Sequence, residues 1–225
     1  MDLRVENIRK CYGKKQILSG CAFTAARGDC VGIIGTNGTG KSTLLRIIAG
    51  VLKADEGRVL WQDQDLLRDA ALRAQTVSYV PQGTPLIEEL SALDNLRLWY
   101  EPAALEHSLE QGMLRSLGVH AFLKTVASRL SGGMRKRLSI GCALARDPDV
   151  LLLDEPTAAL DLVCKEQILD AFQALREAGR LLILVTHDQW ELGMCSQLHL
   201  LSGGKLEPYS YQGDLRTLIR DLERP

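Results

Sequence analysis

Short apolar runs separated by longer helical patterns recur along the chain. Runs of four or five residues with almost no polar member are typical of buried strands and are too short to span a membrane. Short stretches rich in β-branched and aromatic residues, or with apolar residues in alternation, also indicate strands. The segments that meet one of these criteria are Leu3, Val5 and Ile8 near the start, CVGII at 30–34, GRVLW at 57–61, TVSYV at 76–80, VLLL at 150–153 and LLILV at 181–185.

Helical patterns fill most of the spaces between these strands. The segment from about 86 to 148 is helical in pattern, and within it Ser91 and Asp94 have the arrangement of a capping box. Gly118 has the character of a helix end, and Pro148 closes the segment. The expected helices are KSTLLRIIAGVL at 41–52, one that opens at Ser91, 104–118, 132–145, 163–179 and a short one from Asp188.

The alternation of strands and helices predicts the fold class. Units of this kind build a mainly parallel sheet covered by helices, so we expect an α/β protein. The helical segment interrupts the alternation and is therefore expected to be an insertion. We predict a single domain over 1–225, with a core at about 1–85 and 149–225 and a helical subdomain at about 86–148.

Composition narrows the class of protein. Of the 225 residues 46% are hydrophobic, which suits one compact domain. The net charge of −1 gives no reason to expect a nucleic-acid partner, and the basic run 135–137 is interpreted as a solvated helix face. No apolar run approaches 18 residues and the N-terminus lacks a signal-peptide core, so a cytoplasmic protein is expected. The six cysteines include no CxxC pair and are expected to be reduced thiols.

A glycine-rich turn between the strand at 30–34 and the helix at 41–52 has the pattern G-x-x-x-x-G-K-[ST]. Glycines let backbone N–H groups approach phosphate oxygens, and the helix N-terminus adds a positive dipole end. A lysine places a positive charge near the β- and γ-phosphates, and a serine hydroxyl can bind Mg²⁺. The alternative is a glycine turn before an ordinary helix. The predicted phosphate-binding residues are Gly35, Thr36, Asn37, Gly38, Thr39, Gly40, Lys41, Ser42 and Thr43.

Two acids follow the apolar strand at 150–153. Asp154 and Glu155 should emerge at the carboxyl edge of the sheet, where open α/β sheets bind their ligands. Asp154 is the candidate that holds Mg²⁺, directly or through its ligands, and Glu155 is the candidate general base for an attacking water. Alone, such a pair is more often a solvated loop, but the phosphate loop upstream favours the functional interpretation.

Two more polar residues follow predicted strands and should reach the same edge. His187 follows LLILV at 181–185 and could hydrogen-bond the γ-phosphate and orient the water. Gln82 follows the strand at 76–80, and its amide could bind Mg²⁺ or the water. A structural histidine and a polar loop residue after Pro81 are the alternatives.

The tetrapeptide LSGG occurs twice, at 130–133 and at 201–204. The first copy opens a helix, where Ser131 and free N–H groups form an anion site suited to a γ-phosphate. The second copy lies between alternating apolar residues, with Leu198 and Leu200 before it and Leu206 after it. We therefore predict that 202–204 is only the turn of a β-hairpin.

In this order the motifs resemble the nucleotide-binding domain of ATP-binding cassette (ABC) proteins, over roughly residues 2–213. The phosphate loop and the pair Asp154–Glu155 are similar to the Walker A and Walker B motifs, and Leu130 to Met134 to the signature. Other positions that resemble family motifs are Tyr12, similar to the aromatic residue that stacks on adenine, Gln82, similar to the Q-loop glutamine, Ala159-Leu160-Asp161, similar to the D-loop, and His187, similar to the switch histidine. The resemblance implies a RecA-like P-loop NTPase fold with an antiparallel N-terminal β part.

The resemblance also implies ATP hydrolysis to ADP and phosphate, with ATP and Mg²⁺ bound. Catalysis would use Lys41, Gln82, Glu155 and His187, and the metal would use Ser42, Gln82 and Asp154. Two such domains pack head to tail, so that one ATP lies between the phosphate loop of one protomer and the signature of the other. The residues implied to face the other protomer's ATP are Ser131, Gly132, Gly133 and Met134, with Asp161 in the D-loop.

The expected partners are transmembrane permease subunits and a second nucleotide-binding subunit, either identical or different. They would place the chain at the inner face of the cell membrane, and the short helical insertion favours an exporter-type subunit. The alternative is a non-transport ABC ATPase that acts on a soluble or cell-division complex. A generic P-loop kinase would not explain Ser131 or His187.

Two positions depart from the usual ABC pattern. Met134 stands where the signature usually ends in Gln, and it offers no amide hydrogen bond. Ala158 stands where the D-loop usually has a serine hydroxyl. Because neither change touches Lys41, Asp154 or Glu155, ATPase activity is still expected.

Overall fold

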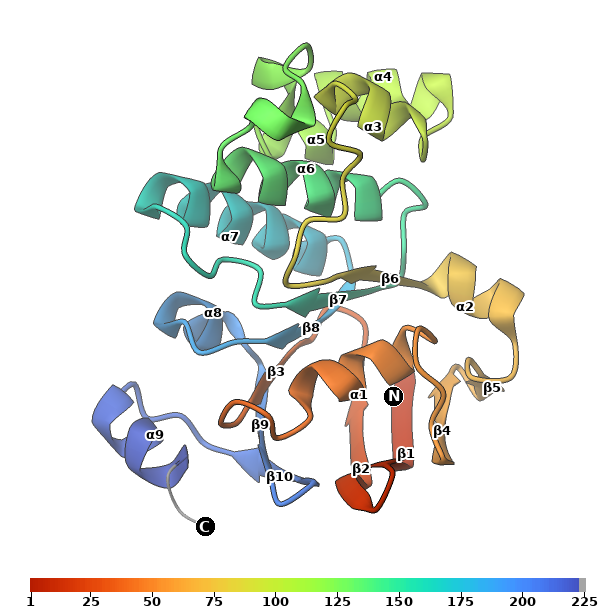
Figure 1. Cartoon of the computed structure of the whole chain (residues 1–225), viewed down its shortest axis with the longest axis vertical. Helices are drawn as coiled ribbons and strands as arrows, with labels where there is room; N and C mark the ends of the chain where they lie inside the picture. The colour runs from red at the N-terminus through yellow and green to blue at the C-terminus, as the bar shows by residue number, and fades with distance from the viewer. Residues whose placement is uncertain (223–225) are drawn as a thin grey trace.

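The computed structural model describes residues 1–222, which form two sheets and the helices packed on them (Figure 1). The strands of the larger sheet are β3 (Cys30–Ile34), β6 (Val77–Val80), β7 (Val150–Asp154), β8 (Leu181–Val185), β9 (Gln197–Ser202) and β10 (Lys205–Tyr209). Those of the smaller sheet are β1 (Leu3–Tyr12), β2 (Lys15–Ala25), β4 (Glu56–Trp61) and β5 (Gln64–Asp65).

The larger sheet has the order β10-β9-β3-β8-β7-β6, and every neighbouring pair in it is parallel except β9 with β10. The smaller sheet, β2-β1-β4-β5, is antiparallel throughout. The predicted α/β fold with an antiparallel N-terminal part is therefore confirmed. β2 was not among the predicted strands, because its register against β1 shifts between Ile8 and Arg9 and again between Lys10 and Cys11, where the extra residue lies on β2 and breaks the period of two that reveals a strand.

Nine α-helices are present in residues 1–222: α1 (Lys41–Ile48), α2 (Ala70–Thr76), α3 (Ala92–Arg97), α4 (Pro102–Glu110), α5 (Met113–Ser116), α6 (Gly132–Ala143), α7 (Leu162–Glu177), α8 (Gln189–Met194) and α9 (Leu215–Leu222). Two 3₁₀ turns cover Val119–Phe122 and Ala127–Arg129. Ser91 caps α3 as expected, since its Oγ accepts a 3.1 Å hydrogen bond from the N–H of Asp94.

The expected single helix over 104–118 is wrong. Gly112 takes an extended conformation, with φ −103° and ψ −158°, and this separates α4 from α5. A Cβ at that position would lie 2.8 Å from the Cα of Ser108, so the two short helices meet at a glycine that permits close backbone approach. The helices α2 and α9 were also not expected.

Both faces of the parallel sheet are buried, which explains the purely apolar runs that predicted its strands. Along β8, Leu181, Ile183 and Val185 face the core shared with α1 and the small sheet. Leu182 and Leu184 face the core shared with α6 and α7. The sheet is thus a rigid layer between two cores, and its carboxyl edge is a fixed platform for the loops that follow its strands.

The helical insertion and the C-terminal helix lie at opposite ends of the molecule (Figure 1). Helix α6 packs with α7 on one face of the sheet, α3 to α5 lie beyond α6 at one end of the molecule, and α9 lies near the β10 edge. The subdomain limits at about 85 and 149 stay a prediction, and residues 223–225 of the predicted core lie outside the described residues.

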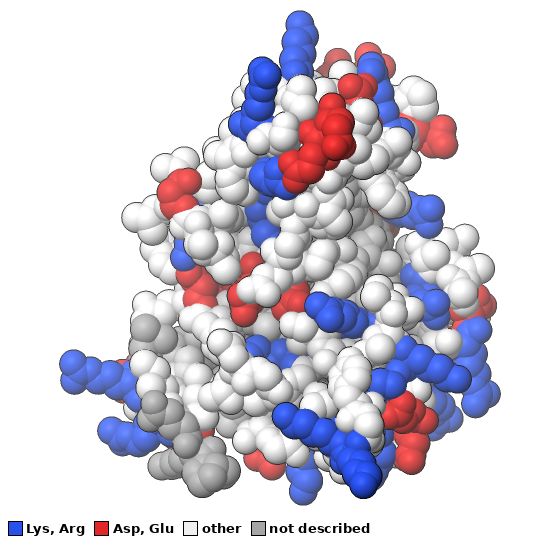
Figure 2. Space-filling view, viewed as in Figure 1, with Lys and Arg blue, Asp and Glu red and all other residues white. Residues whose placement is uncertain are grey.

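The surface carries mixed charge. On the face shown in Figure 2, basic and acidic side chains mix over the upper part, whereas basic side chains are the more frequent at the lower right, with a few acidic ones among them. Among residues 1–222, no helix combines the length and the apolar character needed to cross a bilayer.

Candidate functional site

Four loops that carry the predicted site residues leave neighbouring strands of the parallel sheet at the same edge. In the order β3-β8-β7-β6, these strands lead into the phosphate loop, His187, the Asp154–Glu155 pair and Gln82, respectively. Because parallel strands end at a common edge, residues from four distant parts of the sequence meet there. The same edge was expected from the sequence pattern.

The phosphate loop is tightly braced by its own backbone. Lys41 is only 6% exposed, and its Nζ donates hydrogen bonds to the carbonyl oxygens of Gly35, at 2.6 Å, and Thr36, at 3.0 Å. Thr39 Oγ1 also donates to Thr36 O, at 2.9 Å. Burial lowers the pKa of Lys41, while the nearby carboxylates of Glu155 and Asp154 oppose this shift. The lysine thus fixes a positive charge at the base of the loop.

Gly35 is required by its surroundings. A Cβ at this position would lie 2.5 Å from the carbonyl oxygen of Leu201 in β9, a contact that real side chains do not make. The first glycine of the loop therefore permits close packing against the neighbouring strand as well as approach to a phosphate.

A hollow of about 460 Å³ opens beside the phosphate loop. Of the predicted residues, Tyr12, Asn37, Gly38, Gly40, Lys41, Ser42, Thr43, Gln82 and Glu155 line it. Gly35, Thr36 and Thr39 lie in the loop without lining the hollow. Ile17 of β2 also lines it and was missed, because β2 itself was not predicted. Tyr12 is 51% exposed at the end of β1, so an aromatic face is available opposite the loop.

Two of the three side chains predicted to hold Mg²⁺, Ser42 and Asp154, contact one another. Ser42 Oγ donates a 3.0 Å hydrogen bond to Asp154 Oδ1, and Tyr79 Oη donates a 3.2 Å bond to Asp154 Oδ2. Asp154 is 2% exposed, and the two hydroxyls supply one hydrogen bond to each of its buried carboxylate oxygens. Hydroxyl, carboxylate and amide oxygens are hard donors, and one or two of them with phosphate oxygens and waters are the usual set around Mg²⁺. The donor set fits the ion.

Glu155 is held by the Q-loop residue. Gln82 Nε2 donates a 2.7 Å hydrogen bond to Glu155 Oε2. The backbone of Glu155 has φ 47°, an unusual value for a residue with a side chain, and its N–H donates to Val185 O at 2.9 Å. The turn after β7 therefore aims this carboxylate at the hollow, and strain of this kind is common where geometry serves a site.

His187 lies beside a second hollow of about 350 Å³, which Asn37 and Glu155 line as well. The surrounding protein lowers the pKa of His187, and the Lys41 ammonium lowers it further, while Glu155 opposes the shift. The imidazole is therefore neutral at pH 7 and can accept or donate a hydrogen bond.

The signature residues lie apart from both hollows. Ser131 caps α6 by accepting a 3.2 Å hydrogen bond from the N–H of Met134. Gly133 packs on α7 so closely that a Cβ there would overlap Cys164 Sγ. Asp161 caps α7 by accepting a 2.9 Å bond from the N–H of Cys164, and this bond lowers its pKa. The signature and the D-loop thus meet within one chain, with Ser131 and Gly132 exposed.

The second LSGG copy is the tip of a hairpin, as predicted. β9 and β10 pair in antiparallel register with Ser202 opposite Lys205. Gly203 and Gly204 have φ values of 55° and 77°, which a two-residue turn of this twist requires. No helix follows this copy, so no helix dipole is available for an anion.

The basic run 135–137 is not a solvated face, and that interpretation is wrong for Lys136 above all. Lys136 is 5% exposed, and its Nζ donates to the carbonyl oxygens of Pro81 and Gln82. Arg135 forms an ion pair with Glu88, and Arg137 donates to Gln167 Oε1 at 2.6 Å. All three cations satisfy acceptors in other elements, which a helical pattern alone does not reveal.

Comparisons with known proteins give the family of the chain. The family model described as "ABC transporter" matches residues 18–158, more than half of the chain. The chain is 32% identical over 218 residues to the linearmycin resistance ATP-binding protein LnrL of Bacillus subtilis (strain 168), with 95% of this chain and 70% of that protein covered. It is also 32% identical over 208 residues to Nod factor export ATP-binding protein I of Ralstonia nicotianae, with 90% and 65% covered. The chain thus spans about two thirds of the length of these two relatives.

Solved structures agree with these sequence relationships. A nucleotide-free ATP-binding cassette from an ABC transporter superposes with a TM-score of 0.84 at 27% identity, covering 98% of this chain and 95% of that one. The dimeric structure of a post-hydrolysis cassette bound to ADP and phosphate has a TM-score of 0.80 at 28% identity, with 91% and 96% covered. The chain belongs to the ABC transporter family. Within that family it is an ATP-binding subunit that hydrolyses ATP, and such subunits dimerise and act with transmembrane subunits.

Proposed function

We propose that the residues at the sheet edge hydrolyse ATP in the way that their positions suggest. Glu155 accepts the proton of a water whose oxygen attacks the γ-phosphorus, and the bond from that phosphorus to the ADP oxygen breaks, which gives ADP and phosphate. The observation that supports this role best is the carboxylate of Glu155, which faces the same hollow as the phosphate loop and is oriented by Gln82.

The remaining residues bind and orient the substrate in this proposal. Tyr12 stacks on adenine, the loop from Gly35 to Thr43 cradles the phosphates, and Lys41 neutralises the β- and γ-phosphate charge. Ser42, Asp154 and Gln82 hold Mg²⁺, which when bound withdraws charge from the phosphate oxygens. His187 hydrogen-bonds the γ-phosphate. Ser131, Gly132, Gly133, Met134 and Asp161 contact the ATP held by the other protomer.

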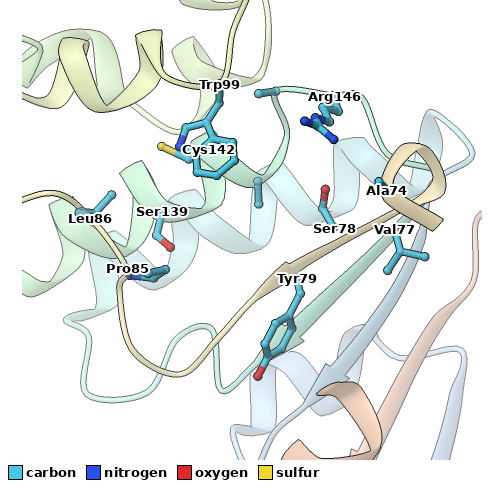
Figure 3. A pocket seen from close by; sticks show the side chains of 12 residues that line it. Ala74, Val77, Ser78, Tyr79, Pro85, Leu86, Trp99, Ser139, Cys142 and Arg146 are labelled. Carbon is cyan, nitrogen blue, oxygen red and sulfur yellow. The ribbon is translucent and has the colours of Figure 1, made fainter. Parts of the chain in front are cut away.

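The membrane partner has a matching surface in this proposal. A groove of about 340 Å³ lies between β6 and the helical insertion, and its lining includes Tyr79, Leu86, Trp99 and Cys142 (Figure 3). Leu98 and Trp99 at the end of α3 are 55% and 57% exposed, and Ile87 just after Gln82 is 46% exposed. An apolar groove next to the Q-loop suits a short amphipathic helix of a permease. This would bring the chain to the inner face of the membrane.

We propose export as the direction of transport. The names of LnrL and of the Nod factor protein refer to resistance and export, and both align with at least 90% of this chain. A probable sulfate/thiosulfate import ATP-binding protein of Chlorella vulgaris is 33% identical over 212 residues, so identity by itself does not set the direction.

The test is purification of the tagged chain from gently solubilised membranes of its own host. We expect a polytopic membrane protein to co-purify, and inverted vesicles that contain both proteins should take up cargo when ATP is supplied.

Trp99→Glu should abolish co-purification and leave ATP hydrolysis by the isolated chain within about twofold of the parent rate, because a charge in the groove opposes apolar docking. Ile219→Glu, at an equally exposed apolar position on α9, is the matched control and should still co-purify. Recovery of a soluble assembly factor in place of a membrane protein would support the non-transport alternative.

A further inference from the structure

A buried lysine in α6 has no part in the site described above. Lys136 lies five residues after Ser131, the cap of that helix, and it is 5% exposed. A buried ammonium is costly unless its N–H groups are paired, so its position needs compensating contacts. Of its neighbours in sequence, Arg135 binds the same segment further on, at Thr84 Oγ1 and Glu88, and Arg137 donates to Gln167 Oε1 in α7. Lys136 is the one of the three that bonds the backbone at Pro81 and Gln82.

The contacts of Lys136 are two consecutive backbone carbonyls of the Q-loop. Its Nζ lies 3.1 Å from Pro81 O and 2.9 Å from Gln82 O, across 54 residues of sequence in the second case. Burial lowers the pKa of Lys136, and the carboxylates of Asp154, Glu191 and Glu155 oppose that shift. The two carbonyls and the field of these acids therefore offset part of the cost of burying the ammonium.

The held backbone carries the side chain that contacts the general base. Gln82 is exposed, and within residues 1–222 its side chain makes one hydrogen bond, the 2.7 Å contact from Nε2 to Glu155 Oε2. An exposed glutamine loses rotamer freedom when it makes one such bond, so the fixed position of its backbone decides how often the bond forms. From the side of the helical insertion, Lys136 bonds this backbone directly at the two carbonyls, whereas Arg135 reaches the segment through the side chains of Thr84 and Glu88.

We propose that Lys136 is a positioning residue for ATP hydrolysis, which holds Pro81 and Gln82 so that the Gln82 amide orients Glu155. This inference rests on the proposed roles of Gln82 and Glu155. The proposed role also links the signature helix physically to the catalytic base Glu155. Ser131 and Lys136 both belong to the α6 region, Lys136 bonds the Q-loop backbone, and the Gln82 side chain on that backbone bonds Glu155. Since Ser131 is proposed to contact the ATP of the other protomer, Lys136 would join one nucleotide site to the catalytic base of the next.

The first test compares steady-state ATP hydrolysis by the full chain with that of two variants. Lys136→Met keeps the length of the side chain and removes its donors, and we expect kcat to fall about tenfold with KM for ATP within about twofold, because the nucleotide contacts are untouched. Lys136→Arg retains donors for both carbonyls and should restore kcat to within about threefold. A Lys136→Met variant with unchanged kcat, or one whose loss lies in KM, would overturn the proposal.

A double-mutant cycle with Gln82→Ala shows whether Lys136 acts through the glutamine. In the Gln82→Ala background, Lys136→Met should change kcat by less than about twofold, whereas independent effects would multiply. Full multiplication would contradict the proposed route. If Gln82→Ala alone leaves kcat unchanged, the proposed role of Gln82 in hydrolysis is wrong. This result is distinct from multiplicative effects, which would contradict only the proposed role of Lys136.

Hydrogen exchange provides a readout that needs no turnover. In Lys136→Met the backbone amides of Leu86 and Ile87, which donate to Thr84 O and Asn95 Oδ1, should exchange at least about tenfold faster than in the parent chain, because their segment has lost a backbone contact to α6. Arg137→Met is the matched control, since Arg137 donates to Leu117 O and Gln167 Oε1 and not to this segment. It should lower the melting temperature and leave both kcat and the exchange of these two amides unchanged. If those amides exchange at equal rates in the parent chain and in Lys136→Met, Lys136 does not hold the Q-loop backbone in place.

Discussion

At the scale of single residues, the charges at the sheet edge are held by neutral partners. Asp154 accepts bonds from two hydroxyls, Glu155 from an amide, and Lys41 donates to two backbone carbonyls. Direct ion pairs between these groups would cancel the charges that substrate and metal need. Neutral partners fix the positions of the three groups and leave their charges available for the chemistry.

A different buried residue makes stability depend on pH. His199 in β9 is 8% exposed, neither of its ring nitrogens has a hydrogen-bond partner within residues 1–222, and burial lowers its pKa. The unfolded chain therefore binds a proton at His199 at a higher pH than the folded chain does, so stability falls as pH drops below the ordinary histidine value of about 6.5. His199→Leu should remove up to about 1 kcal/mol of the loss in unfolding free energy between pH 7.5 and 5.5, measured by urea denaturation.

A substitution of Phe23, whose ring lies next to His199, is the control for this pH dependence. Phe23 lies with its centroid 5.6 Å from that of His199, and Phe23→Leu should lower stability by about 1 kcal/mol at both pH values. If the His199→Leu chain keeps the full pH dependence of the parent, another group is responsible for it.

At the scale of elements, the order of strands and loops could be predicted, and contacts across elements could not. The phosphate loop, Asp154, Glu155 and His187 follow buried strands whose apolar runs are visible in the sequence, so their common edge follows from topology. Ile17 escaped notice because its strand is irregular in register, and Tyr79 because its hydroxyl reaches Asp154 from within β6. The contacts of Lys136 could not be predicted, because helical spacing does not show which hydrogen-bond acceptors of other segments lie against a helix.

The two LSGG segments allow the same tetrapeptide to be compared at a helix N-terminus and in a hairpin turn. Ser131→Ala should lower ATP hydrolysis about tenfold, the effect expected when a charge-assisted hydrogen bond is lost, and should destabilise α6 by about 1 kcal/mol. Ser202→Ala, at the exposed hairpin, should leave both quantities unchanged. Turnover is measured at a temperature where both variants are fully folded, and equal turnover in the two would remove Ser131 from the site.

At the scale of the whole molecule, the proposed function requires one chain to carry two halves of different nucleotide sites. The hollow at the phosphate loop is lined by β1, β2 and the edge loops, while Ser131 and Gly132 are exposed on the helical insertion. A second protomer would have to approach both surfaces at once, in head-to-tail order. The D-loop packs against the signature glycine and lies between the two surfaces.

A dimer that cannot hydrolyse its substrate should therefore persist. With ATP and Mg²⁺, Glu155→Gln is expected to elute as a dimer in size-exclusion chromatography with light scattering, because nucleotide stays bound between the protomers. Adding Ser131→Arg to the same chain should return it to a monomer, since the large cation blocks the second half of each site. Monomeric Glu155→Gln at saturating ATP would count against a functional signature in a chain with Met134.

The contact between Gly35 and the carbonyl oxygen of Leu201 has a consequence for how this sequence can evolve. A backbone oxygen is the same whatever amino acid stands at position 201, so no substitution there can make room for a side chain at position 35. Gly32, three residues earlier in β3, is crowded by the side chains of Leu198 and Cys195 instead. A larger residue at 32 can be accommodated once those neighbours shrink, whereas position 35 stays closed in every genetic background. The two glycines therefore differ in epistasis. Gly32 can be replaced when its neighbours change with it, whereas Gly35 is constrained by a main-chain atom that no substitution removes.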